Sequence, residues 1–210
     1  MARTVGILKF GYRTKLDGTL QDALDVMVDQ GAEVVTVVLP EPDRNVDALF
    51  DEFPSSLAEY LAKEPTAPGR AWARLVKPGD PGASRRKPTT QAYREAVAER
   101  MVHRRDLAAF MDRRELDAVA YPVSATTAGE ILPPGVDNVV GHFNCGPAAV
   151  AGLPALAIPA GFASDGLPVG LELLGRAFDE PTLISIASGF EAHTDHRGLP
   201  ASTPPLPTED

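Results

Sequence analysis

Two apolar runs of strand length, separated by a short turn signal, dominate the stretch from Asn144 to Gly175. The runs are Pro154–Ala160 and Val169–Leu174, and the connector between them contains Asp165-Gly166, a pair typical of hairpin turns. We therefore expect a β-hairpin at this place in the chain.

The two faces of this hairpin differ in side-chain size. Because side chains alternate along a strand, the large apolar residues share one face of each run: Leu156, Ile158, Val169, Leu171 and Leu173. The opposite face carries the small residues Ala155, Ala157 and Gly170, which favours close packing against another element. Pro159 has no N–H to donate and predicts an edge position or a bulge. The hairpin must therefore join a larger sheet.

The rest of the chain alternates between strand and helix patterns. Further strands are predicted over Thr4–Phe10, Glu33–Leu39 and Asp117–Tyr121. Helices are predicted from a capping-box-like start at Thr19 to a stop at Gly31, over Val46–Ala62, from Thr89 or Thr90 to about Arg114, and after the cap residue Asp179.

The predicted fold class is α/β, with a mixed sheet and helices on both faces. The first strand, helix and second strand form a unit whose parallel strands require a right-handed crossover. We expect one domain over residues 1–198, a long surface excursion over Glu64–Lys87, and a flexible tail over residues 199–210, which is rich in Pro, Ser and Thr.

Several of these segments carry a family resemblance. Residues 151–161 and 165–175 resemble the C-terminal signature of the amidase-signature hydrolases, and the match continues through Phe178-Asp179-Glu180 to Phe190-Glu191. Leu116–Pro122 resembles the strand before the pocket in that family, and Glu52–Ala62 is similar to a helix of its peptide-amidase-like members. The resemblance implies the C-terminal portion of a fold that hydrolyses amide C–N bonds.

The catalytic residues of that family are not found in this chain. Family members use a Ser nucleophile, a second Ser in a Gly-Ser-Ser-Gly-type loop and an upstream Lys. The adjacent Ser55-Ser56 lies between Pro54 and Leu57 without a glycine, and no Ser has the Gly-x-Ser-x-Gly context of a nucleophile elbow. We expect the chain alone to be inactive, and whether it is an enzyme stays open.

The resemblance implies pocket residues rather than bond-breaking ones. Tyr121 and Ser124 lie where the chain leaves a strand end, the usual place for ligands in α/β sheets, and Phe143 and Asn144 lie just before the hairpin. Arg100 accompanies the pocket region in the family. For Asn144 the alternative is a turn residue that satisfies backbone groups, and for Arg100 it is a structural ion pair.

Two other reactive side chains have an ordinary structural explanation. Cys145 follows His142 by three residues, which is compatible with a thiol nucleophile and its base, but a lone buried Cys acting as a small hydrophobe is far commoner. His103 stands beside Arg104 on the long predicted helix, where a half-exposed surface residue is the ordinary interpretation. The four His are scattered, so neither a metal nor another cofactor is predicted.

Charge and composition narrow the classes of partner. The net charge of −9 disfavours general binding to nucleic acid or to an anionic membrane. The segment from Lys63 to Arg114, however, is basic, because it contains thirteen Lys and Arg residues but only six Asp and Glu residues. The basic run Arg85-Arg86-Lys87, with Arg70 and Arg74, is compatible with binding a phosphate or an acidic partner, although a solvated basic loop without interleaved aromatics is the commoner case. No apolar run is long enough to span a bilayer, no signal peptide is recognised, and a cytoplasmic location is expected.

These observations leave three functional hypotheses. The first is the C-terminal portion of an amidase, which completes the sheet and walls the pocket for a small amide substrate while another chain supplies Ser, Ser and Lys. The second is a non-catalytic binding or scaffold protein derived from such an enzyme. The third is an independent hydrolase that uses Cys145. The expected partner is an amidase N-terminal chain or a second copy, because an incomplete sheet presents an uncovered edge or face.

Overall fold

The structure is a computed structural model, and it describes residues 3–8, 16–41, 52–63, 89–130, 144–198, 200 and 203. The chain divides into two compact units, Met1–Leu39 with Ala108–Asp210, and Pro40–Leu107. The expectation of a single domain over residues 1–198 stays a prediction.

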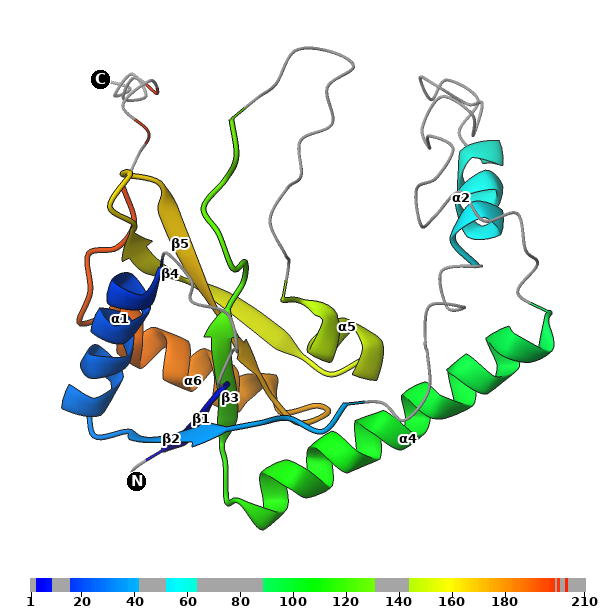
Figure 1. Cartoon of the computed structure of the whole chain (residues 1–210), viewed down its shortest axis with the longest axis horizontal. Helices are drawn as coiled ribbons and strands as arrows, with labels where there is room; N and C mark the ends of the chain where they lie inside the picture. Colours follow the sequence, from blue (N-terminus) through cyan, green and yellow to red (C-terminus); the bar gives the residue numbers. More distant parts are fainter. Residues whose placement is uncertain are drawn as a thin grey trace, which may run out of the picture. The chain divides into compact units, whose positions relative to one another are not determined.

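The first unit is built on a five-stranded sheet with the strand order β2-β1-β3-β5-β4 (Figure 1). The strands are β1 (Thr4–Leu8), β2 (Glu33–Val37), β3 (Ala118–Pro122), β4 (Ala155–Phe162) and β5 (Pro168–Leu174). The helices of this unit include α1 (Asp17–Asp29), α5 (Gly146–Ala151) and α6 (Glu180–Glu191).

The sheet is mixed. β1 is parallel to both β2 and β3, whereas β5 is antiparallel to β3 and to β4. The β1–α1–β2 segment is therefore the parallel unit that the sequence predicts, and residues 154–174 form the predicted hairpin. All five predicted strands are present, and the predicted class of a mixed sheet flanked by helices is confirmed. The short helix α5 has no counterpart among the predicted elements.

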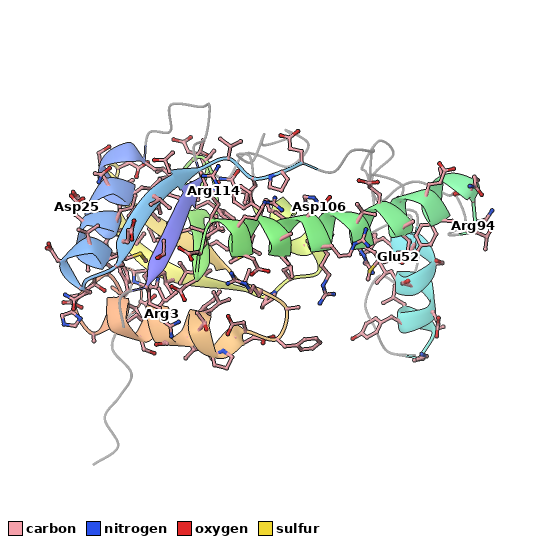
Figure 2. The ribbon with its side chains drawn as sticks, turned by 90° about the horizontal axis from the view of Figure 1, so that it is seen from below. Arg3, Asp25, Glu52, Arg94, Asp106 and Arg114 are labelled. Carbon is pink, nitrogen blue, oxygen red and sulfur yellow. The ribbon has the colours of Figure 1, made fainter. Side chains whose placement is uncertain are left out.

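The hydrophobic core lies on the sheet face that α1 and α6 cover (Figure 1). Both helices contact β4. The buried members of this core come from every layer: Val5, Met27, Ile158, Leu171, Leu173, Leu183 and Phe190. Each large side chain contributes about 1.5–3 kcal/mol when fully buried, so this face supplies much of the folding free energy. On α1, the side chains of Asp22, Asp25 and Asp29 are exposed, and Asp25 points outward in Figure 2.

The start of α1 differs from the prediction. The helix begins at Asp17, two residues before the expected capping residue Thr19. The Thr19 hydroxyl donates instead to the carbonyl oxygen of Phe162 at the end of β4, 3.2 Å away. The side chain is thus used to connect α1 to the hairpin, and not to cap the helix. The predicted stop at Gly31 is present, with a φ of +85°.

The hairpin shows both features expected from its sequence. Gly166 has a φ of +76° in the turn, a conformation that glycine adopts without steric cost, and the carboxylate of Asp165 accepts the N–H of Leu167 at 3.1 Å. β4 is an edge strand, and its pairing with β5 shifts register between Pro159 and Gly161. The proline is therefore accommodated by an edge and a bulge together.

The second unit contains α2 (Phe53–Ala62) and most of α4 (Gln91–Arg113). The hydroxyl of Thr90 accepts the N–H of Tyr93 at 3.1 Å, so Thr90 caps α4 as predicted. The Tyr93 hydroxyl donates to the carboxylate of Glu52.

Two predicted segments lie outside the described residues: the surface excursion over Glu64–Lys87, with its basic residues, and residues 46–51 of the predicted helix. In the part of the chain that the structure describes, no helix is long and apolar enough to cross a membrane.

Candidate functional site at the end of β3

A groove of about 610 Å³ opens where β3 ends beside the hairpin. Its size falls within the usual range of small-molecule sites, about 300–1,000 Å³. Its walls come from the segment after β3, from β4 and from β5, with a largely apolar lining that includes Val123, Ser124, Thr127, Ala157, Pro159 and Gly170. The carboxyl end of a strand beside neighbouring strands is the place where α/β sheets usually bind ligands. This groove is the candidate site.

Close backbone packing shapes one wall of the groove. An added Cβ at Gly170 would lie 3.0 Å from a methyl group of Val123, closer than side-chain contacts normally come. The carbonyl oxygen of Gly170 also accepts the N–H of Val123 at 3.0 Å. Glycine at this position therefore lets the segment after β3 lie directly against β5, which brings Ser124 to the groove.

Ser124 is the predicted pocket residue that lines the groove itself. Its side chain is partly exposed, and its hydroxyl oxygen accepts the N–H of Thr126 at 3.3 Å. The hydroxyl hydrogen can still be donated, since a serine hydroxyl is both a donor and an acceptor. Farther along the same segment, the Thr127 hydroxyl donates to Asp165 in the hairpin turn at 2.8 Å, which connects the two sides of this end of the sheet.

Asn144 holds the end of β3 from the other side. Its N–H donates to the carbonyl oxygen of Val123 at 2.9 Å, and its side-chain amide donates to the carbonyl oxygen of Pro122 at 2.8 Å. Two backbone carbonyls that leave the sheet ladder are thereby satisfied. The backbone-satisfying role considered for Asn144 is thus observed, and it places Asn144 beside Tyr121 and Ser124.

Tyr121 lies near the end of β3, two residues before Val123 of the groove, on the sheet face opposite the α1–α6 core. Its side chain is 1% exposed, and its hydroxyl donates to the carboxylate of Glu172 at 2.7 Å. Burial raises the pKa of Tyr121, and the hydrogen bond to Glu172 raises this pKa further. The Tyr121 hydroxyl therefore stays protonated and acts as a hydrogen-bond donor.

Glu172 was not among the predicted site residues. Its side chain is 6% exposed, in the middle of β5, directly opposite Tyr121 in the register of β3 and β5. A signal for it was present, because a charged residue between Leu171 and Leu173 must face away from the core that those leucines fill. The cross-strand partner could not be read from the sequence, since it depends on the register.

The remaining predicted pocket residues are Phe143 and Arg100. Phe143 lies outside the described residues. Arg100 belongs to the second compact unit, where its charge acts on Tyr93. The hydrogen bond to Glu52 raises the pKa of Tyr93, and the charge of Arg100 partly opposes this effect.

Two expectations about burial were wrong. Cys145 is exposed, at the residue before α5, and is not the buried small hydrophobe that a lone cysteine usually is. Conversely, His103 is 4% exposed rather than half-exposed. Burial lowers the pKa of His103, and the charges of Asp106 and Glu99 oppose this change. Among the described residues, no three His, Cys, Asp or Glu side chains gather as ligands for a metal ion.

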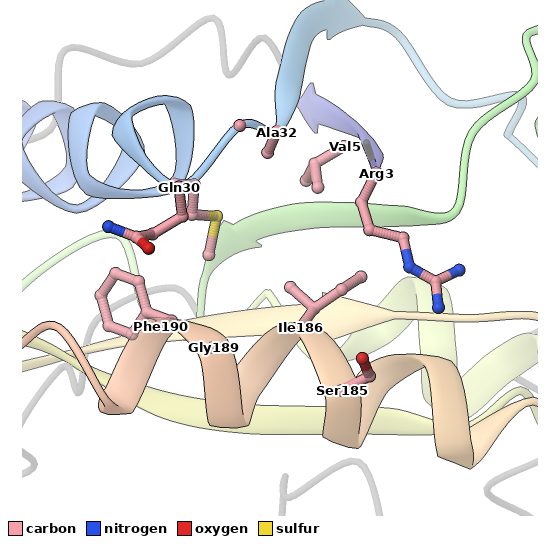
Figure 3. A pocket seen from close by; sticks show the side chains of 10 residues that line it. Arg3, Val5, Gln30, Ala32, Ser185, Ile186, Gly189 and Phe190 are labelled. Atoms are coloured by element: carbon pink, nitrogen blue, oxygen red, sulfur yellow. The ribbon is translucent and has the colours of Figure 1, made fainter. Parts of the chain in front are cut away.

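A second, smaller cavity of about 140 Å³ lies between α6 and the end of α1 (Figure 3). Ile186 and Phe190 of α6 face Val5 and Gln30 across it, as Figure 3 shows. Arg3 at its rim is already paired with Asp117, at 2.9 Å. Its lining is mainly apolar, its arginine is already paired, and its volume is much smaller than that of the groove at the end of β3, which therefore stays the candidate site.

Comparison with known proteins gives this fold and groove a family. Residues 3–184 match the Amidase family. One glutamyl-tRNA(Gln) amidotransferase subunit, from Roseiflexus sp. (strain RS-1), is 30% identical over 90% of this chain and 44% of its own length. The native peptide amidase from Stenotrophomonas maltophilia has a TM-score of 0.68 and 27% identity, over 93% of this chain and 44% of that chain. A peptide amidase in complex with the competitive inhibitor chymostatin has a TM-score of 0.71 and 25% identity, over 93% of this chain and 45% of that chain.

The chain belongs to the Amidase family. It spans less than half the length of these relatives and solved structures, which it matches over most of its own length. The resemblance read from the hairpin residues is thereby confirmed, and so is the expectation that the chain corresponds to only part of such an enzyme.

Proposed function

We propose that this chain forms the pocket-bearing C-terminal portion of an amide-hydrolysing enzyme, and that a separate polypeptide portion supplies the Ser, Ser and Lys of the reaction. One observation carries this proposal. A groove of ligand size lies at a strand end in a chain that belongs to the Amidase family yet lacks a Gly-Ser-Ser-Gly-type loop. Amide C–N bond cleavage by a serine nucleophile then requires residues from outside this chain.

The serine pair present in the chain supports this division of labour. Ser55 and Ser56 lie within α2, and the Ser55 hydroxyl donates to the carbonyl oxygen of Glu52, 3.0 Å away. A hydroxyl on a regular helix, with its hydrogen donated to a backbone carbonyl, lacks the strained turn and the neighbouring base that activate a nucleophile. This pair is therefore not a substitute for the family's catalytic serines.

In this proposal, the residues at the end of β3 either bind the substrate or hold the groove in shape, and none of them takes part in breaking the amide bond. Ser124 donates a hydrogen bond to the substrate in the groove. Asn144 holds the segment after β3 in place, and the Tyr121–Glu172 pair fixes β3 against β5 near this strand end. Arg100 and Phe143 stay proposed contributors from the family resemblance. A cytoplasmic location fits the single free thiol of Cys145.

The test is amide hydrolysis with purified components. The chain alone, a polypeptide from the same genome that carries the N-terminal amidase portion, and their mixture are assayed with small amide substrates. We expect turnover only in the mixture. Ser124→Ala should raise KM of the mixture about threefold to tenfold, the effect of losing one hydrogen bond of about 1 kcal/mol, whereas the exposed Ser188→Ala should not change it.

Turnover by the isolated chain that survives extensive purification and disappears on mutating one of its residues would overturn the proposal. A mixture that forms a stable complex but never hydrolyses amides would favour a non-catalytic scaffold descended from an amidase.

A further inference from the structure

Phe178 is the most exposed large apolar side chain in the described part of the structure, at 88%. Its backbone φ is +63°, in the left-handed region that bulky residues rarely occupy. A phenylalanine in solvent gains nothing from burial that could offset an unfavourable backbone conformation. We therefore infer that Phe178 contributes to binding another molecule and not to the stability of this fold.

The backbone around Phe178 forms a turn in which glycine would be preferred. The N–H of Asp179 donates to the carbonyl oxygen of Arg176 at 3.2 Å, so Phe178 occupies the third position of a four-residue turn. With a positive φ, that position is the one that type II turns fill with Gly or Asn. The ring is consequently presented at a conformational cost.

Both ends of this turn are fixed by hydrogen bonds. The Arg176 guanidinium donates to Asp112 at 2.8 Å and to the carbonyl oxygen of Leu116 at 2.7 Å. At the other end, the Thr182 hydroxyl donates to the Asp179 carboxylate at 2.6 Å. A side chain displayed on a fixed turn loses little conformational entropy on binding, which suits an aromatic interface residue.

The turn lies next to another uncovered apolar surface. The N–H of Gly175, three residues before Phe178, donates to the carbonyl oxygen of Pro154 at 3.0 Å. This bond places the turn at the end of the hairpin where β4 begins, and the first alternate residues of that edge strand, Ala155 and Ala157, are exposed. Small side chains on an edge strand let another polypeptide approach closely.

The relatives of this chain contain more polypeptide than the part that it matches. Phe178 lies within residues 3–184, which match the Amidase family. In two of the relatives, the matched region is only 44% of the whole chain, so more than half of each relative has no counterpart in this sequence. We propose that Phe178 is the main interface residue through which this chain binds the polypeptide portion that carries the rest of the amidase fold. This inference rests on the proposed function, because it needs that portion to exist as a binding partner.

The experiment measures binding of the N-terminal amidase polypeptide from the same genome to the wild-type chain and to three variants. Phe178→Gly removes the ring and permits the positive φ, whereas Phe178→Ala removes the ring but not the unfavourable backbone. Both should weaken binding at least about 30-fold, the range of interface hot spots. Val28→Ala, which shortens another half-exposed apolar side chain on α1, should change the dissociation constant less than about threefold.

Thermal unfolding of the free chain provides the second measurement. Phe178→Gly should melt at the same temperature as the wild type or higher, so a loss of binding cannot be a loss of folding. A dissociation constant unchanged in both Phe178 variants would overturn the inference and leave the proposed function standing. If the wild-type chain does not bind the polypeptide at all, both proposals fail. Concentration-dependent dimerisation of the chain that disappears in Phe178→Gly would assign the surface to a second copy and overturn the inference.

Discussion

The hydroxyl of Tyr121 and the carboxylate of Glu172 form a 2.7 Å hydrogen bond across two antiparallel strands, with both side chains buried. A buried carboxylate needs a hydrogen-bond donor. Removing that donor destabilises the fold by more than a typical hydrogen bond stabilises it, because the carboxylate is left buried without its partner. The pair therefore fixes the relation of β3 to β5 near the strand end at which the groove opens.

Removing this donor should destabilise the fold. Tyr121→Phe leaves the shape of the core almost unchanged but withdraws a hydrogen bond from buried Glu172, and we expect a loss of about 1–3 kcal/mol in the free energy of unfolding. Urea unfolding followed by circular dichroism measures it. The double variant Tyr121→Phe with Glu172→Gln, which removes the charge as well, should recover part of the loss. Equal stability of Tyr121→Phe and the wild type would show that this bond contributes nothing.

Acid should destabilise the protein partly through His103. Because burial lowers the pKa of His103 in the folded state, the unfolded chain takes up a proton near pH 6.5 while the folded chain does not. The stability contributed by neutral His103 is therefore complete above the unfolded pKa and is lost as the pH falls toward the folded pKa. The wild type should lose more stability between pH 7.5 and pH 5.5 than His103→Gln does. Identical losses in both proteins would contradict burial of this imidazole.

Arg176 should matter more than an exposed ion pair. Its guanidinium reaches both Asp112 and the carbonyl oxygen of Leu116, and a lysine cannot reproduce this planar pair of donors. Arg176→Lys should cost about 1–2 kcal/mol by urea unfolding. The control is Lys63→Met, which breaks a solvent-exposed pair with Glu59 and should change stability by less than about 0.5 kcal/mol. If the two variants lose the same free energy of unfolding, the hydrogen bond from Arg176 to Leu116 adds nothing to stability beyond an exposed ion pair.

Cys145 should be reactive but dispensable. As an exposed thiol it should be modified by Ellman's reagent in the folded protein, and Cys145→Ser should change stability by less than about 0.5 kcal/mol, as surface substitutions usually do. Activity of the reconstituted enzyme should survive both changes. Loss of activity both on labelling and in Cys145→Ser would restore the thiol-nucleophile hypothesis.

Much of the fold could be predicted because its signals are local. The alternation of large and small residues along 154–174, the Asp165-Gly166 turn and the position of Pro159 together gave the hairpin, its core face and its bulge. Helix ends were less predictable. Thr19 has the sequence context of a cap, but its hydroxyl is used in a tertiary hydrogen bond to Phe162, which no local pattern reveals.

The candidate site was only partly predictable because it depends on register and packing. Tyr121, Ser124 and Asn144 were expected near one strand end, and they do gather there. Glu172 was missed because its hydrogen-bond partner depends on the register of β3 against β5, which places Tyr121 opposite it. The burial of His103 and the exposure of Cys145 were both misjudged, since each depends on what packs over the residue and not on its neighbours in sequence.

The central claim is that this chain completes an enzyme whose catalytic serines and lysine lie in another polypeptide portion. The most direct measurement is a titration in which increasing amounts of the chain are added to a fixed amount of the N-terminal amidase polypeptide, while the rate of amide hydrolysis is followed. We predict negligible hydrolysis by either component alone, and a rate that rises linearly with added chain and reaches a plateau at one equivalent. A rate that does not depend on the added chain, or hydrolysis by the chain alone, would contradict the claim.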